Sequence, residues 1–528
     1  MWARRLLPLL LIVSGCASQA APPPPPPAAL ASAAARRIEA VASCEGARVQ
    51  GASWSRDGHL VALHLDASVR VLETEKWQTS MTAKFARPVE KLVFSADRRY
   101  LFSVTTQTEE PYARELIVFR VPDGERMWQG RIADGERSLA IAADSSWFAA
   151  VIADPPDPDG YQTTWHAELV SIPLFTARKL RPPAHTTQLP RPAWHPRKVP
   201  RPEGHASANG METVLPISNG PADYSLDLEV PGKCCEVLAS GDSRTLAVSY
   251  EDVTSVVDVQ EGAVVSALVG AAPTFSPSGR WLVLGRKSGS VTLFDTRKRH
   301  GTLIYDALCD VDLARLGPPP DFNADESLLA LGGYNPALCL VSTARGKVEA
   351  LVPRELPTPT PQLEHGRSAP GGFSSDGSAI VSVGPFAQSL FRVDSGEYIE
   401  IKNDDGLYAW FFVRRADDSL IAFDMNRRPL AEVLGHHLEP LPEPHDDCGY
   451  LELSPDGEKG LHASNGVQTL CSTRSFQPVA TFTQKDGYWD FDPSSRFVHG
   501  THPRGFSVFS ATNGRRLFHL EYCEPRSR

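Results

Sequence analysis

Four aspartates in similar sequence surroundings are the first candidates for acid–base chemistry. Asp57, Asp97, Asp376 and Asp456 each stand two residues after a serine. A pair of catalytic carboxyl groups needs two unlike environments, so that one group donates a proton while the other stays ionised. Equivalent surroundings instead indicate a structural role in a turn, where an aspartate accepts hydrogen bonds from the backbone that follows it.

Histidines lie close to acidic residues in one dense group. Its spacing is not typical of a metal site, and the prolines within it indicate a solvated loop. Its members are His436, His437, His445, Asp446 and Asp447. The sequence also lacks a nucleophile elbow, a P-loop, a dinucleotide-binding fingerprint and a HExxH helix. It therefore predicts no catalytic residue, no metal and no cofactor.

A proline-rich segment near residues 176–232 gathers positive charge in a chain whose formal net charge is −10. Two interpretations stay open, a disordered surface insertion or an arm that binds an anionic envelope polymer or phospholipid surface. The basic residues concerned are Arg178, Lys179, Arg181, Arg191, Arg197, Lys198 and Arg201. The acidic balance of the whole chain disfavours binding to nucleic acid.

A repeated pattern indicates which elements position these side chains. Beyond Cys44, an aromatic residue or leucine is followed by a small polar residue, a turn rich in Asp, Gly and Ser, and an apolar strand. Most successive starts are about 37 to 51 residues apart, the period of four-stranded propeller blades. Copies begin at Trp54, Phe94, Phe275, Phe322, Phe373, Leu453 and Phe491, with weaker copies near Ile141, Leu238 and Val413.

Each copy has the residue types of a hairpin followed by two further strands. The polar residues suit a tight turn because Gly tolerates a positive φ and Asp binds its own backbone. Four strands of about six residues and their turns use about 40 residues. One such sheet cannot bury both faces alone, so neighbouring copies must stack face to face. Tandem immunoglobulin-like sandwiches would instead repeat at about 100 residues.

These copies resemble WD-repeat blades and the related Ser-Pro-Asp-Gly repeats of periplasmic TolB-like propellers, over nearly all of the chain after Cys44. No Gly-His dipeptide opens these copies and no Trp-Asp closes them, as these dipeptides do in WD units, and Phe294-Asp295 comes nearest to the closing pair. The resemblance implies an all-β fold, a β-propeller of about ten degenerate four-stranded blades over residues 44–525. The sequence does not decide whether these blades form one large ring or two propellers.

The cysteines that follow Cys16 are expected to form structural disulfides, since no CxxC pair typical of metal or redox sites occurs. Cys234 and Cys235 are adjacent and have no predicted partner. Three pairs are predicted, the first between residues that flank the copies and would lock the first unit to the last, the others within about one unit each: Cys44 with Cys523, Cys309 with Cys339, and Cys448 with Cys471.

The N-terminal residues have the order of an export signal. Two arginines precede an apolar run too short to span a bilayer as a helix, so residues 1–15 are predicted to be removed. Val13-Ser14-Gly15-Cys16 resembles the lipobox of bacterial lipoproteins, which implies that Cys16 becomes the lipidated N-terminus. By the same resemblance, Ala17 in place of aspartate favours sorting to the outer membrane. Residues 16–43 contain six consecutive prolines and are predicted to form a tether.

The composition, 42% hydrophobic and 22% charged residues, is close to the average of soluble globular proteins. Together these features predict a lipid-anchored protein of the cell envelope, facing the periplasm or the cell surface. Its propeller is expected to bind or scaffold a protein or polymer partner without catalysis. The alternative is a propeller enzyme, a hydrolase or lyase, with its site in the central funnel. The sequence does not distinguish the partner, the leaflet or the oligomeric state.

Overall fold

The computed structural model describes residues 49–180 and 236–521, apart from internal gaps. Within the described residues the chain consists of strands and turns, and its one helix is the short 3-10 element η1 (Asp446–Cys448). No helix in this part of the chain is long and apolar enough to cross a membrane. The gaps are 66, 107–112, 134–136, 154–164, 173, 251, 287–289, 305–319, 332–337, 353–368, 374–378, 384–387, 394–397, 401–410, 415–419, 424–428, 435–436, 442–444, 449–450, 465–466, 483–486 and 503–504.

The strands pair antiparallel, and nearly every strand pairs with the next along the chain. The strands of the first half are β1 (Val49–Trp54), β2 (Leu60–Leu65), β3 (Ser68–Glu73), β4 (Gln78–Lys84), β5 (Val89–Phe94), β6 (Tyr100–Thr105), β7 (Ala113–Arg120), β8 (Arg126–Ala133), β9 (Leu139–Ile141), β10 (Trp147–Ala153), β11 (Trp165–Ser171), β12 (Thr176–Leu180), β13 (Glu236–Ala239), β14 (Thr245–Tyr250), β15 (Val253–Asp258), β16 (Ala263–Val269), β17 (Ala271–Phe275), β18 (Trp281–Gly285), β19 (Val291–Asp295) and β20 (His300–Ile304).

The second half continues in the same manner. Its strands are β21 (Asp321–Phe322), β22 (Leu328–Leu331), β23 (Leu338–Ser342), β24 (Lys347–Val352), β25 (Ala369–Phe373), β26 (Ala379–Val383), β27 (Gln388–Arg392), β28 (Tyr398–Glu400), β29 (Phe411–Arg414), β30 (Leu420–Phe423), β31 (Pro429–Leu434), β32 (His437–Pro440), β33 (Glu452–Leu453), β34 (Lys459–Ser464), β35 (Val467–Ser472), β36 (Pro478–Phe482), β37 (Tyr488–Phe491), β38 (Phe497–His502), β39 (Gly505–Ser510) and β40 (Arg516–Glu521).

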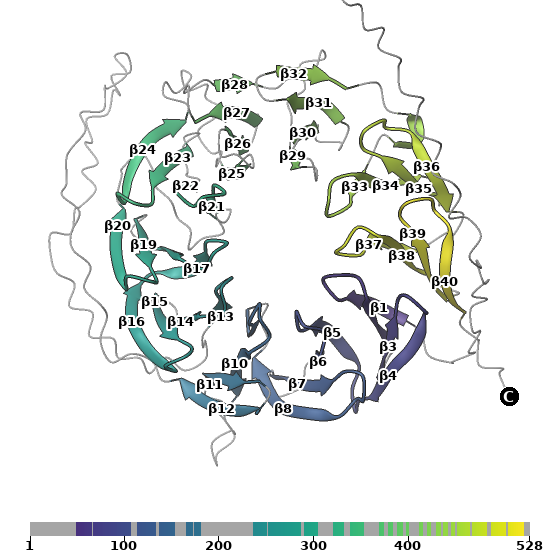
Figure 1. Ribbon diagram of the computed structural model, residues 1–528, viewed down its shortest axis with the longest axis horizontal. Coiled ribbons are helices and arrows are strands. Elements are labelled where there is room, and N and C mark those ends of the chain that lie inside the picture. The colour runs from purple at the N-terminus through teal and green to yellow at the C-terminus, as the bar shows by residue number, and fades with distance from the viewer. Residues whose placement is uncertain are drawn as a thin grey trace, which may run out of the picture.

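The sheets surround one central opening, with the first strand of each sheet toward the opening and the fourth at the rim (Figure 1). This arrangement confirms the predicted all-β propeller, in a single ring. Every repeat start found in the sequence lies at the last or the last but one residue of an innermost strand. The sequence pattern therefore marks the point where the chain leaves the centre of the ring and turns into the second strand.

The sheet pairing departs from separate four-stranded units at one place. Among the described strands, eight sheets have four strands each, whereas β5–β12 form one sheet of eight. The junction is a single pair, Ile132 of β8 opposite Ile152 of β10. Because β9 has only three residues and its pairing with β10 ends at Ala150, the end of β10 is open to β8.

Hydrogen bonds from side chains to the backbone stabilise the turn after the innermost strand. Ser55 Oγ donates to Asp57 Oδ1 (2.8 Å) and accepts from the backbone N–H of Leu60 (2.9 Å). The turn role predicted for the repeated aspartates is confirmed at Asp57, Asp97 and Asp456, while Asp376 lies outside the described residues. The serine and aspartate pairs that share this geometry are Ser55 with Asp57, Ser95 with Asp97, Ser240 with Asp242, and Ser454 with Asp456.

The fourth residue of this turn links neighbouring sheets. It adopts a positive φ, and where it is a serine its Oγ accepts a hydrogen bond from the backbone of the preceding turn, as Ser495 does from Asp456 N (3.0 Å). In the first sheet the position is Gly58 (φ 71°), which lies against the last sheet, because a Cβ there would stand 2.5 Å from Ser494 Oγ. The turns therefore meet across the junction between the two ends of the chain.

Replacing Gly58 by alanine is expected to lower the free energy of unfolding by about 1–3 kcal/mol. The added methyl group would occupy a left-handed backbone position and collide with Ser494 of the last sheet. Gly51→Ala is the matched control, since its nearest neighbour would be His64 Nδ1 at 3.8 Å, an ordinary contact. Urea denaturation of both variants measures the difference, and equal losses would argue against a tight junction at Gly58.

Most of the described core lies between neighbouring sheets. Clusters of buried apolar residues combine side chains of two consecutive sheets, and one cluster lies between the two halves of the eight-stranded sheet, β5–β8 and β9–β12. A further cluster joins the first sheet to the last, where Trp54 stacks on Phe497 (ring centroids 5.3 Å apart) and Trp77 stacks on Phe518 (5.1 Å). The first sheet contains only β1–β4 and the last only β37–β40, so no described strand from one end of the chain completes the sheet at the other end. Side-chain packing therefore closes the ring.

One predicted disulfide is present and ties η1 to a strand. Cys448 bonds to Cys471 of β35, and their Cα atoms are 5.9 Å apart. Cys339 of β23 is also disulfide-bonded. Cys44, Cys309 and Cys523 lie outside the described residues, so the pair proposed to lock the ends of the ring stays a prediction.

Replacing Cys448 and Cys471 together by alanine is expected to lower the free energy of unfolding by about 3 kcal/mol. The bond closes a loop with a sequence separation of 23, and its loss returns chain entropy to the unfolded state. Urea denaturation of the oxidised protein and the double variant gives the value. A double variant as stable as the parent would show that this bond adds nothing to the fold.

Candidate functional site

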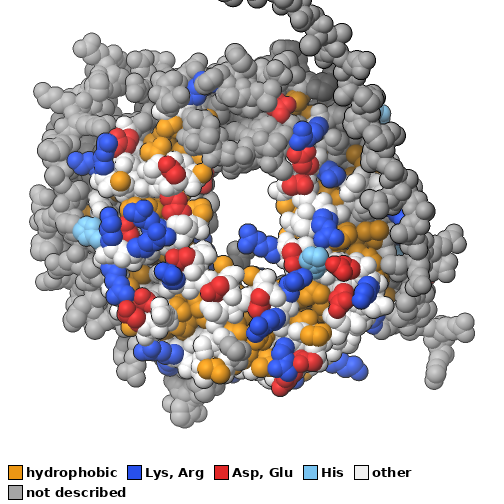
Figure 2. All heavy atoms as spheres, viewed as in Figure 1, with side chains coloured by type: hydrophobic (Ala, Val, Ile, Leu, Met, Phe, Trp, Pro, Cys, Tyr) orange, Lys and Arg blue, Asp and Glu red, His pale blue; other side chains and the backbone are white. Residues whose placement is uncertain are grey.

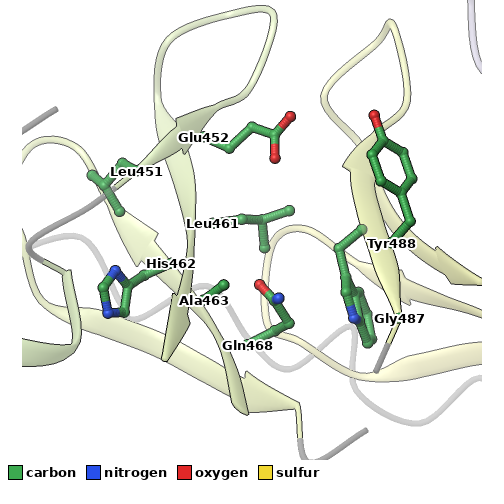
Figure 3. A pocket seen from close by; sticks show the side chains of 9 residues that line it. Leu451, Glu452, Leu461, His462, Ala463, Gln468, Gly487 and Tyr488 are labelled. Carbon is green, nitrogen blue, oxygen red and sulfur yellow. The ribbon is translucent and has the colours of Figure 1, made fainter. Parts of the chain in front are cut away.

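A cavity of about 600 Å³ lies between the last two sheets of the ring. One wall comes from β33, β34 and β35, and the other from the start of β37 (Figure 3). Glu452 and Tyr488 extend from opposite walls at one end of the cavity, while His462 and Gln468 lie toward the other. The lining residues are Leu451, Glu452, Leu461, His462, Ala463, Gln468, Gly487, Tyr488 and Trp489.

Strand β37 positions the aromatic side chains of this cavity. Successive side chains of a strand point to opposite faces, and here Tyr488 is 67% exposed whereas Trp489 is only 4% exposed. The Trp489 ring stacks on Phe482 (centroids 5.2 Å apart), which fixes it in the core between the two sheets. Asp490, two residues after Tyr488, shares its face of the strand and is half-buried.

Glu452 is the one carboxylate among the lining residues, since Asp490 pairs with His499 and faces the first sheet. The charges of Asp490 and Glu452, together with partial burial, raise the pKa of the Tyr488 phenol, and Asp490 contributes most. Burial raises the pKa of Asp490 itself, although the backbone N–H of Phe491 donates to its Oδ1 (2.7 Å). None of the lining residues is lysine or arginine. The polar side chains that the wall offers are those of Glu452, His462 and Gln468.

One buried donor in the wall has no acceptor. In the described part of the chain, the indole Nε1 of Trp489 makes no hydrogen bond. A buried polar group without a partner is unfavourable by about 1–3 kcal/mol. A guest that carries an acceptor could satisfy this N–H, so the wall has both hydrogen-bond acceptors and a donor to offer.

The structure corrects the predicted boundary of the basic insertion. Thr176–Leu180 form β12, which pairs with β11, so Arg178 and Lys179 belong to the rim of a sheet. Arg178 donates to the backbone oxygen of Glu261 (3.2 Å) in the next sheet and so has a structural contact. The composition of this segment is typical of a loop, but its backbone pairs antiparallel with β11 and so forms a strand. The other predicted basic residues lie outside the described part of the chain: Arg181, Arg191, Arg197, Lys198 and Arg201.

The remaining residues singled out in the sequence do not come together as a reactive group. Cys16 lies outside the described residues, as does His436. His445 Nδ1 lies 3.7 Å from Asp447 Oδ2, beside the disulfide. Within the described ranges, no three His, Cys, Asp or Glu side chains are placed to hold a metal ion.

Both signs of charge are interspersed around the opening on the face that Figure 2 shows. Ion pairs also join neighbouring sheets, as between Arg137 Nη1 and Glu236 Oε2 at 3.1 Å. The opening is therefore not lined by a single sign of charge on this face.

Comparison with known proteins finds distant similarity to solved structures. No protein-family model and no curated protein matches the chain. Among solved structures, the β-propeller domain of Myceliophteria thermophila Cps50 (Swd1) is 12% identical, with 67% of this chain and 96% of that chain covered and a TM-score of 0.30. A eukaryotic initiation factor is 12% identical, with 90% and 88% covered and a TM-score of 0.38. The strands and their pairing, rather than these likenesses, establish the chain as a β-propeller.

Proposed function

We propose that this protein is a non-enzymatic binding or scaffold protein of the cell envelope, anchored by a lipid on Cys16, which holds a protein or polymer partner. The cavity between the last two sheets supports this proposal most. It presents an exposed Tyr488, the polar side chains of its wall and the unsatisfied N–H of Trp489 on strands fixed by the core. Rigid strands with exposed aromatic side chains suit recognition, since little conformational freedom is lost on binding.

Photo-crosslinking in intact cells tests the binding function. The full-length protein carries a photoreactive amino acid at Ala463, an exposed residue of the cavity wall, or at Val264, an exposed residue of the outer strand β16, as the control. We expect one discrete crosslinked species at Ala463 and none at Val264. Crosslinking that is absent at Ala463, or equal at both positions, would overturn the proposal.

The anchor is tested separately. Cys16→Ser is expected to abolish labelling by radioactive palmitate and to move the protein from the membrane fraction to the soluble fraction, because acyl chains provide the affinity for the bilayer. Labelling that persists in the variant would contradict lipidation at Cys16.

A further inference from the structure

We infer that the cavity between the last two sheets binds a neutral oligosaccharide whose sugars carry acetamido groups. The inference rests on the proposed binding function and, of its two kinds of partner, names the polymer. Three features of the wall support it: the lack of a free charge, two groups that match an acetamido group, and an exposed aromatic ring.

The first support is the lack of a free charge in the wall. None of the lining residues is lysine or arginine. Glu452 is the one carboxylate among them, and both Glu452 and His462 already interact with another residue. A charged guest would therefore give up its hydration without gaining a free counter-charge, which is unfavourable. A guest without charge avoids this loss.

The second support is a pair of groups that match an acetamido group. The buried Nε1 of Trp489 donates to no acceptor within the described residues, and the half-buried Gln468 extends its amide into the same cavity from β35 (Figure 3). An acetamido group has one carbonyl oxygen and one N–H, so it can accept from the indole and donate to the carbonyl oxygen of Gln468. A carbonyl oxygen that satisfies the buried N–H favours this guest over a sugar without acetamido groups.

The third support is the exposed ring of Tyr488. The side chain is 67% exposed, so one ring face is open to a guest. That face carries partial negative charge, and the C–H groups of a sugar ring can pack flat on it by dispersion. The nearby charge of Asp490 raises the pKa of Tyr488, so the phenol stays uncharged and the ring suits a neutral guest.

The wall offers little to an apolar side chain of a peptide. Leu461 and Trp489 are only 3% and 4% exposed, because both pack in the core between the two sheets. The small side chain of Ala463 is exposed in their place. The cavity volume of about 600 Å³ lies within the range of about 300–1,000 Å³ that is usual for ligand sites. Flat sugar rings therefore match this wall better than a bulky apolar side chain does.

Binding of defined oligosaccharides to the full-length protein, in a detergent without sugar head groups, tests the inference. The probe is tetra-N-acetylchitotetraose, and cellotetraose is its matched control, with the same rings and linkage but no acetamido groups. We expect saturable binding of the probe by calorimetry. Cellotetraose is expected to bind about tenfold more weakly, because it has no acetamido carbonyl for the N–H of Trp489. An acetylated pentaglycine amide, which offers amides without sugar rings, is expected not to bind.

Variants of exposed and half-buried wall residues locate the binding. Tyr488→Ala is expected to weaken binding of the probe about tenfold, whereas Tyr488→Phe keeps the ring and most of the affinity. Gln468→Leu is expected to weaken it about three- to tenfold. Gln78→Leu, the same change at an exposed position of β4 in the first sheet, is expected to leave the affinity unchanged. Circular dichroism verifies that each variant is folded.

A further variant isolates the buried donor. Trp489→Phe removes the N–H and keeps an aromatic ring in the core. It is expected to weaken binding of the probe about three- to tenfold and to leave the weak binding of cellotetraose unchanged, since only the acetamido group uses the N–H. A merely structural effect of this variant would weaken both oligosaccharides equally.

No saturable binding of the probe, equal binding of the two oligosaccharides, or equal effects of Gln468→Leu and Gln78→Leu would overturn the inference. Binding of the glycine peptide in place of the probe would also overturn it and indicate a peptide guest. The proposed function has its own readout. A crosslinked species at Ala463 in cells, together with no binding of the probe, would leave the binding function standing while the inference fails.

Discussion

Replacing Phe506 by alanine is expected to lower the free energy of unfolding by about 3–5 kcal/mol. Phe506 is fully buried in the cluster where the last sheet packs on the first, with its ring centroid 5.9 Å from that of His499 and 6.4 Å from that of Phe518. Interiors are packed as densely as crystals, so the strands of two sheets cannot close the resulting cavity without moving. Urea denaturation followed by far-ultraviolet circular dichroism measures the loss.

Two comparisons identify the junction as the cause. Val264→Ala, at a partly exposed position of the outer strand β16, is expected to change the stability by less than about 0.5 kcal/mol. In Phe506→Ala, the amide hydrogens of β1 and β2 should exchange faster along with those of β38 and β39, because both sheets share the cluster. Faster exchange confined to the last sheet would contradict closure by packing.

The second large effect is a loss of stability in mild acid. Burial lowers the pKa of both His64 and His499 from 6.5 to about 4. Between these values the unfolded chain binds protons that the folded chain does not, so stability is complete above pH 6.5 and falls as the pH drops toward 4. Each histidine accounts for up to about 3 kcal/mol of this loss.

The two histidines lie in different surroundings, so their protonation destabilises different parts of the ring. His499 lies beside Trp54 (ring centroids 5.6 Å apart) at the junction of the ends, and its Nδ1 has no hydrogen-bond partner in the described residues. His64 Nε2 is 3.1 Å from Ser53 Oγ within the first sheet. Protonation of His499 therefore places a charge between the sheets that close the ring.

Variants assign the pH dependence to these side chains. His64→Gln and His499→Gln are each expected to flatten the decline in stability between pH 6.5 and pH 4.5, measured by urea denaturation at several pH values. His59→Gln, at an exposed histidine, is the control and should keep the slope of the parent. Parallel slopes for all four proteins would show that neither buried histidine governs the response.

The sequence was sufficient to predict propeller sheets, though not whether they form one ring or two, because its signal is local and repeated. The Ser-x-Asp unit and the residue with a positive φ specify one turn, and that turn recurs after β1, β5, β13 and β33. The same signal could not predict that β8 pairs with β10, since this single pair depends on the shortness of β9. Nor did the composition around Arg178 reveal that β12 is a strand, because its pairing with β11 decides that.

The candidate site was not predicted, and the reason is its place between two sheets. Tyr488, Trp489 and Asp490 precede a repeat start and read as an ordinary innermost strand. Only the packing of β37 against β33–β35 makes the side chains of Tyr488 and Trp489 one wall of a cavity. The alternation of residue types in Tyr-Trp-Asp-Phe was the one available signal, since it places Tyr488 and Trp489 on opposite faces of the strand.

Electron microscopy of the purified full-length protein, with class averages viewed down the ring axis, tests the central claim most directly. The sheets should radiate from one centre in a closed ring, with the first and last sheets in contact. Two smaller rings, or an open arc with a gap between its ends, would contradict the account.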